Sequence, residues 1–332
     1  MIEHNKSADV VQPNWGSADP LGEALHFLRM DGVFYTRSEF SAPWGLALPS
    51  FPGCVIFHVV TSGRALLCTD GEEQQLLQPG DFALVPHGEG HTLLSKPDAP
   101  AGKLFDLPRQ QISDRYEILR HGGGGEATTM ICGAVRFDHP AAYQLVKFLP
   151  SLIRIDGWRS PQMEWFQSTL RLMATEAAEL RPGGETIITR LADILVIQAI
   201  RSWMAEDPLA QTGWLGALQD PHIGRAILHI QRDPARPWTV QSLAEEVALS
   251  RSVFAARFKT LVGESPMQYL ARWRMNVAVT LLKEEDLSLG ELANRMGYQS
   301  EAAFSRAFKR FIGMSPGAAR KKSKLEAVLE SH

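Results

Sequence analysis

The chain has 332 residues, 45% of them hydrophobic and 21% charged, which is typical of an ordinary globular protein of about two domains. It holds no apolar run of about eighteen residues and its first residues are polar, which argues against a transmembrane helix and a secretory signal. The net charge of -3 conceals an asymmetry, because residues 221–332 hold 17 Lys and Arg against 11 Asp and Glu, a basic balance that favours phosphate partners. We therefore expect a cytoplasmic protein with no membrane partner, and three cysteines without C-x-x-C spacing fit a reducing compartment.

The first half of the chain is predicted to be a β-structure. Short apolar runs are separated there by Gly, Pro and Asp, which is the pattern of strands joined by turns. Strands at this spacing indicate an antiparallel sandwich or barrel. The predicted strands are residues 33–36, 54–60, 65–69, 82–85 and 130–137.

One motif within this region resembles the cupin barrel. Gly80, Pro86, Gly88 and His91 have the spacing of the second cupin motif. The first motif offers His-x-His and then Glu in cupins, and here those places hold His58, Val60 and Arg64. The resemblance covers residues 21 to about 140 and implies a jelly-roll barrel in which two of the four usual metal ligands are replaced.

Three readings of the barrel histidines stay open. If the cupin alignment holds, His58 and His91 project into one cavity, where Cys132 or His87 would complete a set for zinc. The second reading is an effector pocket lined by His58, Arg64, His87 and His91. The third gives these side chains plain structural roles. A metal-dependent cupin enzyme is the alternative from another class, but catalysis needs a metal with open positions, so we expect no enzyme.

Helices are predicted to follow the barrel. Residues 141–153, 162–179 and 186–205 carry apolar side chains at helical spacing. Their apolar faces must be buried against the barrel, against each other or against a second subunit. Residues 207–220 contain a proline, two glycines and polar residues, and we expect a linker there.

The last third of the chain contains a repeat. Two copies of one supersecondary unit are the simplest explanation. Matching residues of the first helices are forty-nine positions apart, and matching residues of the second helices are fifty positions apart. The second copy is therefore one residue longer, and a turn between its two helices can hold the extra residue. The matching residues are Phe254, Phe258, Lys259, Gly263, Ser265 and Pro266 in the first copy, and Phe304, Phe308, Lys309, Gly313, Ser315 and Pro316 in the second.

Each copy is predicted to be a helix-turn-helix. Thr239 and Ser288 are candidate caps of a first helix, and Ser250 and Ser300 of a second. Val253, Phe254 and Phe258 are expected on the buried face of the first copy's second helix. A connecting helix of ~17 residues spans ~25 Å, so the two outer helices can reach successive major grooves ~34 Å apart.

These units resemble the DNA-binding domain of AraC/XylS-type transcriptional regulators. The phrases LAEEVALSRSVFAARFK, GESPMQYLARWRM and ELANRMGYQSEAAFSRAFKRFIGMSP carry the resemblance. The barrel is similar in turn to the cupin-type sensor domain of a branch of that family. By resemblance, the DNA-binding residues are Arg251, Ser252, Ala255, Ala256 and Lys259 in the first unit, and Glu301, Ala302, Ser305, Arg306 and Lys309 in the second.

The family resemblance also implies the partners. We expect a transcription regulator, more often an activator in this family, that binds promoter DNA as a homodimer and contacts RNA polymerase. A small-molecule effector in the barrel would control it. The helix of residues 186–205 is the expected dimer surface, through Leu191, Leu195, Gln198 and Trp203. A sensor whose helices dock protein partners without reading bases is the alternative.

The expected fold class is α+β. An antiparallel β-barrel with trailing helices, residues 21–206, precedes a linker, residues 207–220. An all-α domain of two helix-turn-helix units, residues 221–324, completes the chain.

Overall fold

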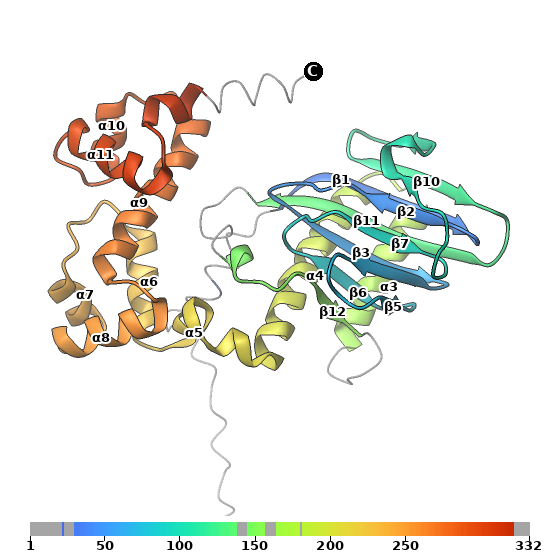
Figure 1. The fold of residues 1–332 in the computed structure, drawn as a ribbon, viewed down its shortest axis with the longest axis horizontal. Coiled ribbons are helices and arrows are strands. Elements are labelled where there is room, and N and C mark those ends of the chain that lie inside the picture. The colour runs from blue at the N-terminus through green and yellow to red at the C-terminus, as the bar shows by residue number, and fades with distance from the viewer. Residues whose placement is uncertain (1–21, 23–29, 138–144, 157–163, 180, 322–332) are drawn as a thin grey trace, which may run out of the picture.

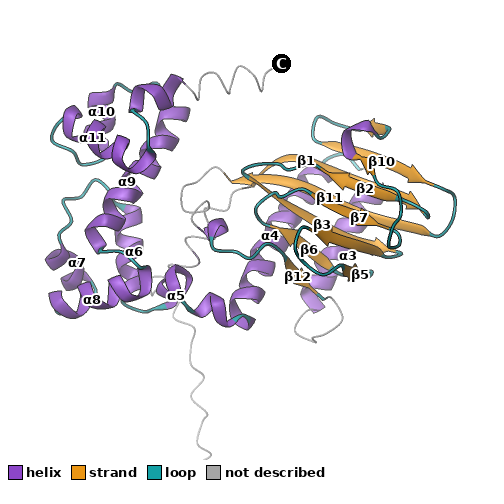
Figure 2. Cartoon of the chain, in the orientation of Figure 1, coloured by secondary structure: helices purple, strands orange, loops and turns teal. Residues whose placement is uncertain are grey.

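A computed structural model gives the fold of the chain in two parts, a β-rich N-terminal part and a helical C-terminal part (Figure 1; Figure 2). The expected outer limits of the two domains, residues 21 and 324, lie outside the described residues. The structure describes residues 22, 30–137, 145–156, 164–179 and 181–321.

Two facing sheets form the N-terminal part. Neighbouring strands are antiparallel except for two parallel pairs, β1 with β10 and β2 with β8. The first sheet has the order β12 (Ile153–Ile155), β6 (Phe82–Val85), β3 (Cys54–Ser62), β11 (Ala127–Phe137), β1 (Met30–Ser41), β10 (Tyr116–Gly122) and β9 (Arg109–Gln111). The second has the order β5 (Gln75–Leu77), β4 (Ala65–Thr69), β7 (His91–Leu94), β2 (Gly45–Leu48) and β8 (Gly102–Lys103). All five predicted strands are present, and the expected α+β fold class is confirmed.

Strand β3 shows how the layers are built. Its side chains alternate between the two faces of the sheet. Ile56 and Val60 belong to the core between the sheets, whereas Val55, Phe57 and Val59 belong to the core on the outer face. Both faces of β3 are covered, which explains why the first seven positions of the strand are all buried.

The outer face of the first sheet is covered by two helices, α3 (Glu164–Glu179) and α4 (Gly184–Glu206) (Figure 1). Phe166 of α3 meets Phe82 edge to face, with ring centroids 5.7 Å apart. Leu195 of α4 is fully buried in the same core. The predicted helices of residues 162–179 and 186–205 are therefore confirmed to within two residues at their ends. The predicted helix of residues 141–153 is wrong over its second half, because only residues 145–147 of its described part are helical and residue 153 begins β12; residues 141–144 lie outside the described residues. No described helix is long and apolar enough to cross a bilayer.

The segment expected as a linker is folded and packed. Residues 207–220 contain a 3-10 helix, η3 (Pro208–Gln211), and a short α-helix, α5 (Gly213–Gln219). Trp214 and Leu218 of α5 are buried. Proline and glycine suggested a flexible connection, but here the proline begins η3 and Gly213 begins α5. The correction follows from Trp214, whose ring stacks on Phe148 of the N-terminal part with centroids 5.4 Å apart.

The helices of the C-terminal part pack around two cores, and the first of these is continuous with the core on the outer face of the first sheet. One core joins α5 to the first unit, and Phe304 and Phe308 are buried in a separate core of the second unit. The remaining helices are α6 (Ile223–Arg232), α7 (Val240–Glu246), α8 (Arg251–Val262), α9 (Pro266–Glu284), α10 (Leu289–Arg295) and α11 (Glu301–Ile312).

Asp193 on α4 is expected to make stability depend on pH. Arg190 lies 3.3 Å from its Oδ2, but Oδ1 is buried and has no hydrogen-bond partner in the described ranges, and burial raises the pKa of the carboxyl to about 6. The folded chain holds this proton more tightly than the unfolded chain, so its contribution to stability falls as pH rises from about 4 to about 6. Asp193→Asn is therefore expected to increase the free energy of unfolding by about 1 kcal/mol near pH 7.5, after discounting for solvent screening.

Urea unfolding of both proteins at about pH 4 and about pH 7.5 measures this difference. The gain should vanish at the lower pH, where the wild-type carboxyl is protonated in both states. An equal gain at both values would mean that the charge of Asp193 is not the cause.

Candidate nucleic-acid interface

The two helix-turn-helix units begin with the same caps. Thr239 and Ser288 open α7 and α10, each in a capping box that satisfies two backbone N–H groups. Ser250 and Ser300 open α8 and α11 by accepting a hydrogen bond from the third N–H of each helix, at 3.4 and 3.2 Å. The caps predicted from the sequence are confirmed, and they fix where each outer helix starts.

The turns between the helices explain the shift in the repeat. Ala248 and Gly297 hold left-handed backbone conformations at matching places, with φ of 55° and 72°. These two residues are forty-nine positions apart, whereas the caps Ser250 and Ser300 are fifty apart. The extra residue of the second unit therefore lies in its turn, as the sequence predicted.

Arg274 on α9 ties the two units together. Its Nε and Nη2 donate hydrogen bonds of 2.6 and 3.0 Å to two backbone carbonyls of the 234–236 loop, which precedes α7 in the first unit. Its guanidinium also lies 5.7 Å from the ring centre of Tyr298 in the second unit. Next to it, a Cβ on Gly297 would come within 2.4 Å of a carbonyl of the same loop, so the approach is close. The two units are thus joined by α9 and by direct contacts (Figure 1).

The predicted DNA-facing residues of α8 lie on its outer side. Lys259 lies near the C-terminal end of α8 and Arg251 at its start. Phe254 and Phe258 occupy the opposite, fully buried face. The exposed members of the predicted set are Arg251, Ser252, Ala256 and Lys259, and Ala255 is half-buried.

Val253 corrects the sequence interpretation. It was expected on the buried face with Phe254 and Phe258, but its side chain is 51% exposed. Consecutive helical residues point about 100° apart, so Val253 and Phe254 cannot both face a core this small. Val253 neighbours Ser252 and adds an apolar surface of the kind that contacts thymine methyl groups. The sequence signal for this exposed position was the pair of adjacent apolar residues, Val253 and Phe254, soon after the cap Ser250, because only one of two adjacent helical residues can face the core.

The predicted residues of α11 are also accessible. Arg306 has no hydrogen-bond or ion-pair partner among the residues that the structure describes, so its guanidinium is available. It borders a groove of about 410 Å³ between α9 and α11, together with Tyr298 and Arg310. By contrast, Arg257 on α8 is bound to Asp220 at 2.9 Å. The exposed members of the predicted set are Glu301, Ala302, Arg306 and Lys309, and Ser305 is half-buried.

Inside the barrel, His58, His91 and Cys132 come together as the sequence suggested. His58 and Cys132 lie on neighbouring strands of the first sheet, and His91 lies on the second. The Nδ1 atom of His58 is 3.0 Å from the sulfur of Cys132, and its Nε2 is 2.7 Å from Nε2 of His91. Burial lowers the pKa of both histidines and raises the pKa of Cys132 to about 12, so all three are neutral.

One further contact fixes the direction of these hydrogen bonds. The Nδ1 atom of His91 is 2.8 Å from the carbonyl oxygen of Glu89, which only accepts, so this nitrogen carries the proton. In a neutral ring, Nε2 of His91 must then accept from Nε2–H of His58. His58 in turn accepts at Nδ1 from the thiol of Cys132. The three side chains form a one-way chain from thiol to carbonyl.

This geometry does not fit the zinc hypothesis. The two ring nitrogens of His58 point in different directions, one to Cys132 and one to His91, whereas metal ligands converge on one point. No group of three His, Cys, Asp or Glu in the described ranges is placed to hold a metal ion. In the structure, the three side chains are linked by hydrogen bonds between the two sheets.

The other two predicted pocket residues lie elsewhere. Arg64 is 62% exposed in its side chain and lies 3.6 Å from Glu126 at the surface. Nε2 of His87 donates to the carbonyl oxygen of Leu149 at 3.0 Å, on the other side of the sheet from His58. Both residues lie in connections between strands and not on the strands that face the barrel interior: Arg64 lies between β3 and β4, and His87 between β6 and β7.

Two facing sheets with covering helices, followed by two linked helix-turn-helix units with exposed outer helices, define the class of DNA-binding transcription regulators with an N-terminal β-domain. Comparison with known proteins supports this class. Residues 19–205 match the family model described as cupin, and residues 243–322 match the one described as helix-turn-helix domain. The chain belongs to the AraC family of transcription regulators.

Relatives match along most of the chain. A putative AraC-like transcription regulator of Streptomyces lividans is 35% identical, covering 91% of this chain and 98% of the relative. The regulator AlkR of Acinetobacter baylyi is 34% identical, covering 92% and 100%. Among solved structures, the DNA-binding domain of AdpA in complex with a target DNA is 32% identical, covering 32% of this chain and 91% of that domain with a TM-score of 0.29. The two full-length relatives are transcription regulators and not enzymes, as was expected for this chain.

Proposed function

We propose that this protein is a sequence-specific transcription activator whose outer helices α8 and α11 read neighbouring major grooves of a promoter. The observation that carries the proposal is the link through Arg274 between two units whose outer faces are exposed. In the first unit, small side chains and Val253 favour apolar contacts and DNA shape over hydrogen bonds. In the second, Arg306 offers a bidentate donor to guanine. Such a protein acts in the cytoplasm.

Selection of duplexes from a random library by the full-length protein tests this proposal. We expect an enriched site with two half-patterns about one helical turn apart, because the two helices enter successive grooves. Affinity should fall steeply between about 50 and 200 mM salt through counterion release. If no sequence is enriched, the proposal is contradicted. The alternative is then a sensor whose helices dock protein partners such as RNA polymerase.

Control by an effector is the second part of the proposal. The N-terminal part and the DNA-binding part share a continuous core, with Phe148 stacked on Trp214 of α5. Helix α5 packs in turn against α8, and Asp220 just after it binds Arg257 of α8. A ligand that favours one packing of the N-terminal part would thus alter how α8 is presented, provided that it binds the two arrangements with different affinity.

We further propose that the protein is a homodimer through α4. Leu195 cannot take part, because it is fully buried within the subunit, and Trp203 is half-buried and donates to Asp207 at 2.9 Å. The outer face of α4 instead carries a stripe at spacings of three and four residues, which is typical of helix pairing. Its members are Ile187, Leu191, Ile194, Gln198 and Arg201, of which Ile187 is 40% and Ile194 45% exposed.

Sedimentation equilibrium of the full-length protein tests the stripe. Wild type is expected to form a dimer, and Ile194→Asp a monomer, because a carboxylate would be buried without a partner. Leu209→Asp is the matched control, since Leu209 is 73% exposed and lies on η3, away from the stripe. A dimer that persists in Ile194→Asp would place the interface elsewhere.

A further inference from the structure

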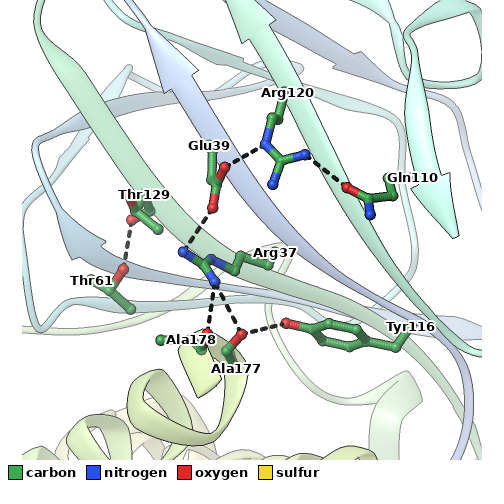
Figure 3. Close-up of polar contacts among 9 residues, drawn as sticks. All are labelled: Arg37, Glu39, Thr61, Gln110, Tyr116, Arg120, Thr129, Ala177 and Ala178. Carbon is green, nitrogen blue, oxygen red and sulfur yellow. Dashed lines mark hydrogen bonds and ion pairs between the residues drawn. The ribbon is translucent and has the colours of Figure 1, made fainter. Parts of the chain in front are cut away.

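A cavity lies outside the two-sheet core, where α4 begins after α3. The last turn of α3 is fastened to the first sheet, because Arg37 donates to the carbonyls of Ala177 and Ala178 at 3.3 Å and the hydroxyl of Tyr116 donates to Ala177 at 3.3 Å (Figure 3). The chain then turns through Gly183, which has φ of 80°, into α4. This arrangement leaves a partly open hollow between the first sheet and the start of α4.

The hollow has a volume of about 180 Å³, and both carboxylates and apolar side chains line it. A water molecule takes about 30 Å³ in the liquid, so there is room for about six waters or one small molecule. The side chains around it are Ile112, Ser113, Tyr116, Glu176, Arg181, Glu185 and Ile188, with Gly183 and Gly184 at the turn.

Glu176 is the feature of this cavity that calls for an explanation. Its residue is only 8% exposed, and its buried Oε2 has no hydrogen-bond partner among the residues that the structure describes. A buried carboxylate without a partner is costly, and in native proteins such a group usually marks a binding role or a missing ligand. A Cβ on Gly184 would lie 3.4 Å from this oxygen, so the carboxylate sits directly beneath the start of α4.

The charge around the cavity is negative. Arg181 has a side chain that is 63% exposed and pairs with Glu179, so its charge is directed to the surface. Glu185 accepts a hydrogen bond from the hydroxyl of Ser113, which leaves its negative charge in place. Two carboxylates, Glu176 and Glu185, thus line a small hollow that also has apolar walls, Ile112 and Ile188.

We propose that this cavity binds a small organic cation, a protonated amine or amidine on a compact apolar body, with Glu176 as its counter-ion. The cation gives Glu176 a partner that the described part of the chain does not supply, and Glu185 is the second acceptor. The apolar body rests against Ile112 and Ile188. Inorganic anions and carboxylates are excluded by the same two charges.

The position of the cavity connects it to regulation. Glu185 and Ile188 belong to the first turns of α4, which has 23 residues and contacts η3 at its other end. Next along the chain, α5 contacts η3 and also α6 and α8 of the DNA-binding part. A ligand that fixes the start of α4 can therefore bias the packing at its other end. This regulatory role rests on the proposed function above, whereas binding of the cation does not.

Isothermal titration of the full-length protein with benzamidine tests the proposal, with benzyl alcohol as the neutral probe and benzoate as the anionic one. Benzamidine is expected to bind one to one, and the other two probes are not. Glu176→Gln keeps the shape of the side chain and should weaken benzamidine binding roughly 10- to 100-fold, through loss of a charge-assisted contact. Glu206→Gln is the control, because it removes a carboxylate at the C-terminal end of α4, far from the cavity, and should change nothing.

A second variant covers the case in which Glu176→Gln fails to fold. Gly184→Ala keeps every charge, meets Glu176 only at ordinary contact distance and adds a methyl group beside the carboxylate. It should stay folded and weaken benzamidine several-fold by reducing the room. The inference is overturned if benzamidine does not saturate below about 10 mM, if benzoate binds instead, or if neither variant changes the affinity. DNA binding measured on the same samples without any probe shows separately whether the proposed function holds.

Discussion

Replacing Phe304 with alanine is expected to unfold the second helix-turn-helix unit while the first stays folded. The Phe304 ring is fully buried and packs against Phe308 and Tyr298, with ring centroids 5.7 Å away in both cases. Removing a buried phenylalanine destabilises a protein by about 3 to 5 kcal/mol through lost burial and the remaining cavity. A core of this size has little else to hold it, and it is separate from the core that includes Phe254.

Hydrogen exchange followed along the chain distinguishes the two units. Amides of α10 and α11 should lose protection in Phe304→Ala, whereas those of α7 and α8 keep it. Phe311→Ala is the control, since Phe311 lies on the same helix but is only partly buried. Equal loss of protection in both units would show that they fold as one cooperative body, and the separation into two cores would then have no energetic meaning.

The helix-turn-helix units were predictable because their signals are local. A cap such as Ser250 or Ser300 acts on an N–H three residues away, and each unit ends at a glycine, Gly263 or Gly313, with φ near 85°. The repeat doubled these signals and located the one-residue shift. Arg274, which joins the units, was not predictable, because its partners lie some forty residues earlier in the chain.

The β-part was predicted only where its strands are buried. Strand β9 consists of three exposed polar residues and has no pattern of its own; its place depends on pairing with β10. The parallel pairing of β1 with β10 also depends on segments about eighty residues apart. Such pairings are tertiary, so alternation along one strand cannot reveal them.

The barrel motif was found from the sequence, but its chemistry was not. Spacing brought His58 and His91 together correctly, and Cys132 with them. The spacing of motif residues cannot predict that the carbonyl oxygen of Glu89 accepts a hydrogen bond from His91. This contact sets the tautomer of His91, and the three side chains then form a chain of hydrogen bonds. In the same way, Glu176 carried no motif. It became a candidate only when the structure showed it buried without a partner.

Replacing Arg306 with alanine is expected to reduce affinity for the specific DNA site by about 1 to 3 kcal/mol and to relax the preference at one base pair. The guanidinium is exposed on the outer face of α11 and has no partner among the described residues, so it can pair bidentately with guanine. Binding to random duplexes should change little. Lys309→Ala, three residues further along α11, is the matched comparison, because a phosphate contact weakens binding to all sequences alike and lowers the salt slope by about one. If Arg306→Ala gave that uniform loss instead, Arg306 would touch the phosphates, and base reading in the second unit would have to fall to Glu301, Ala302 and Ser305.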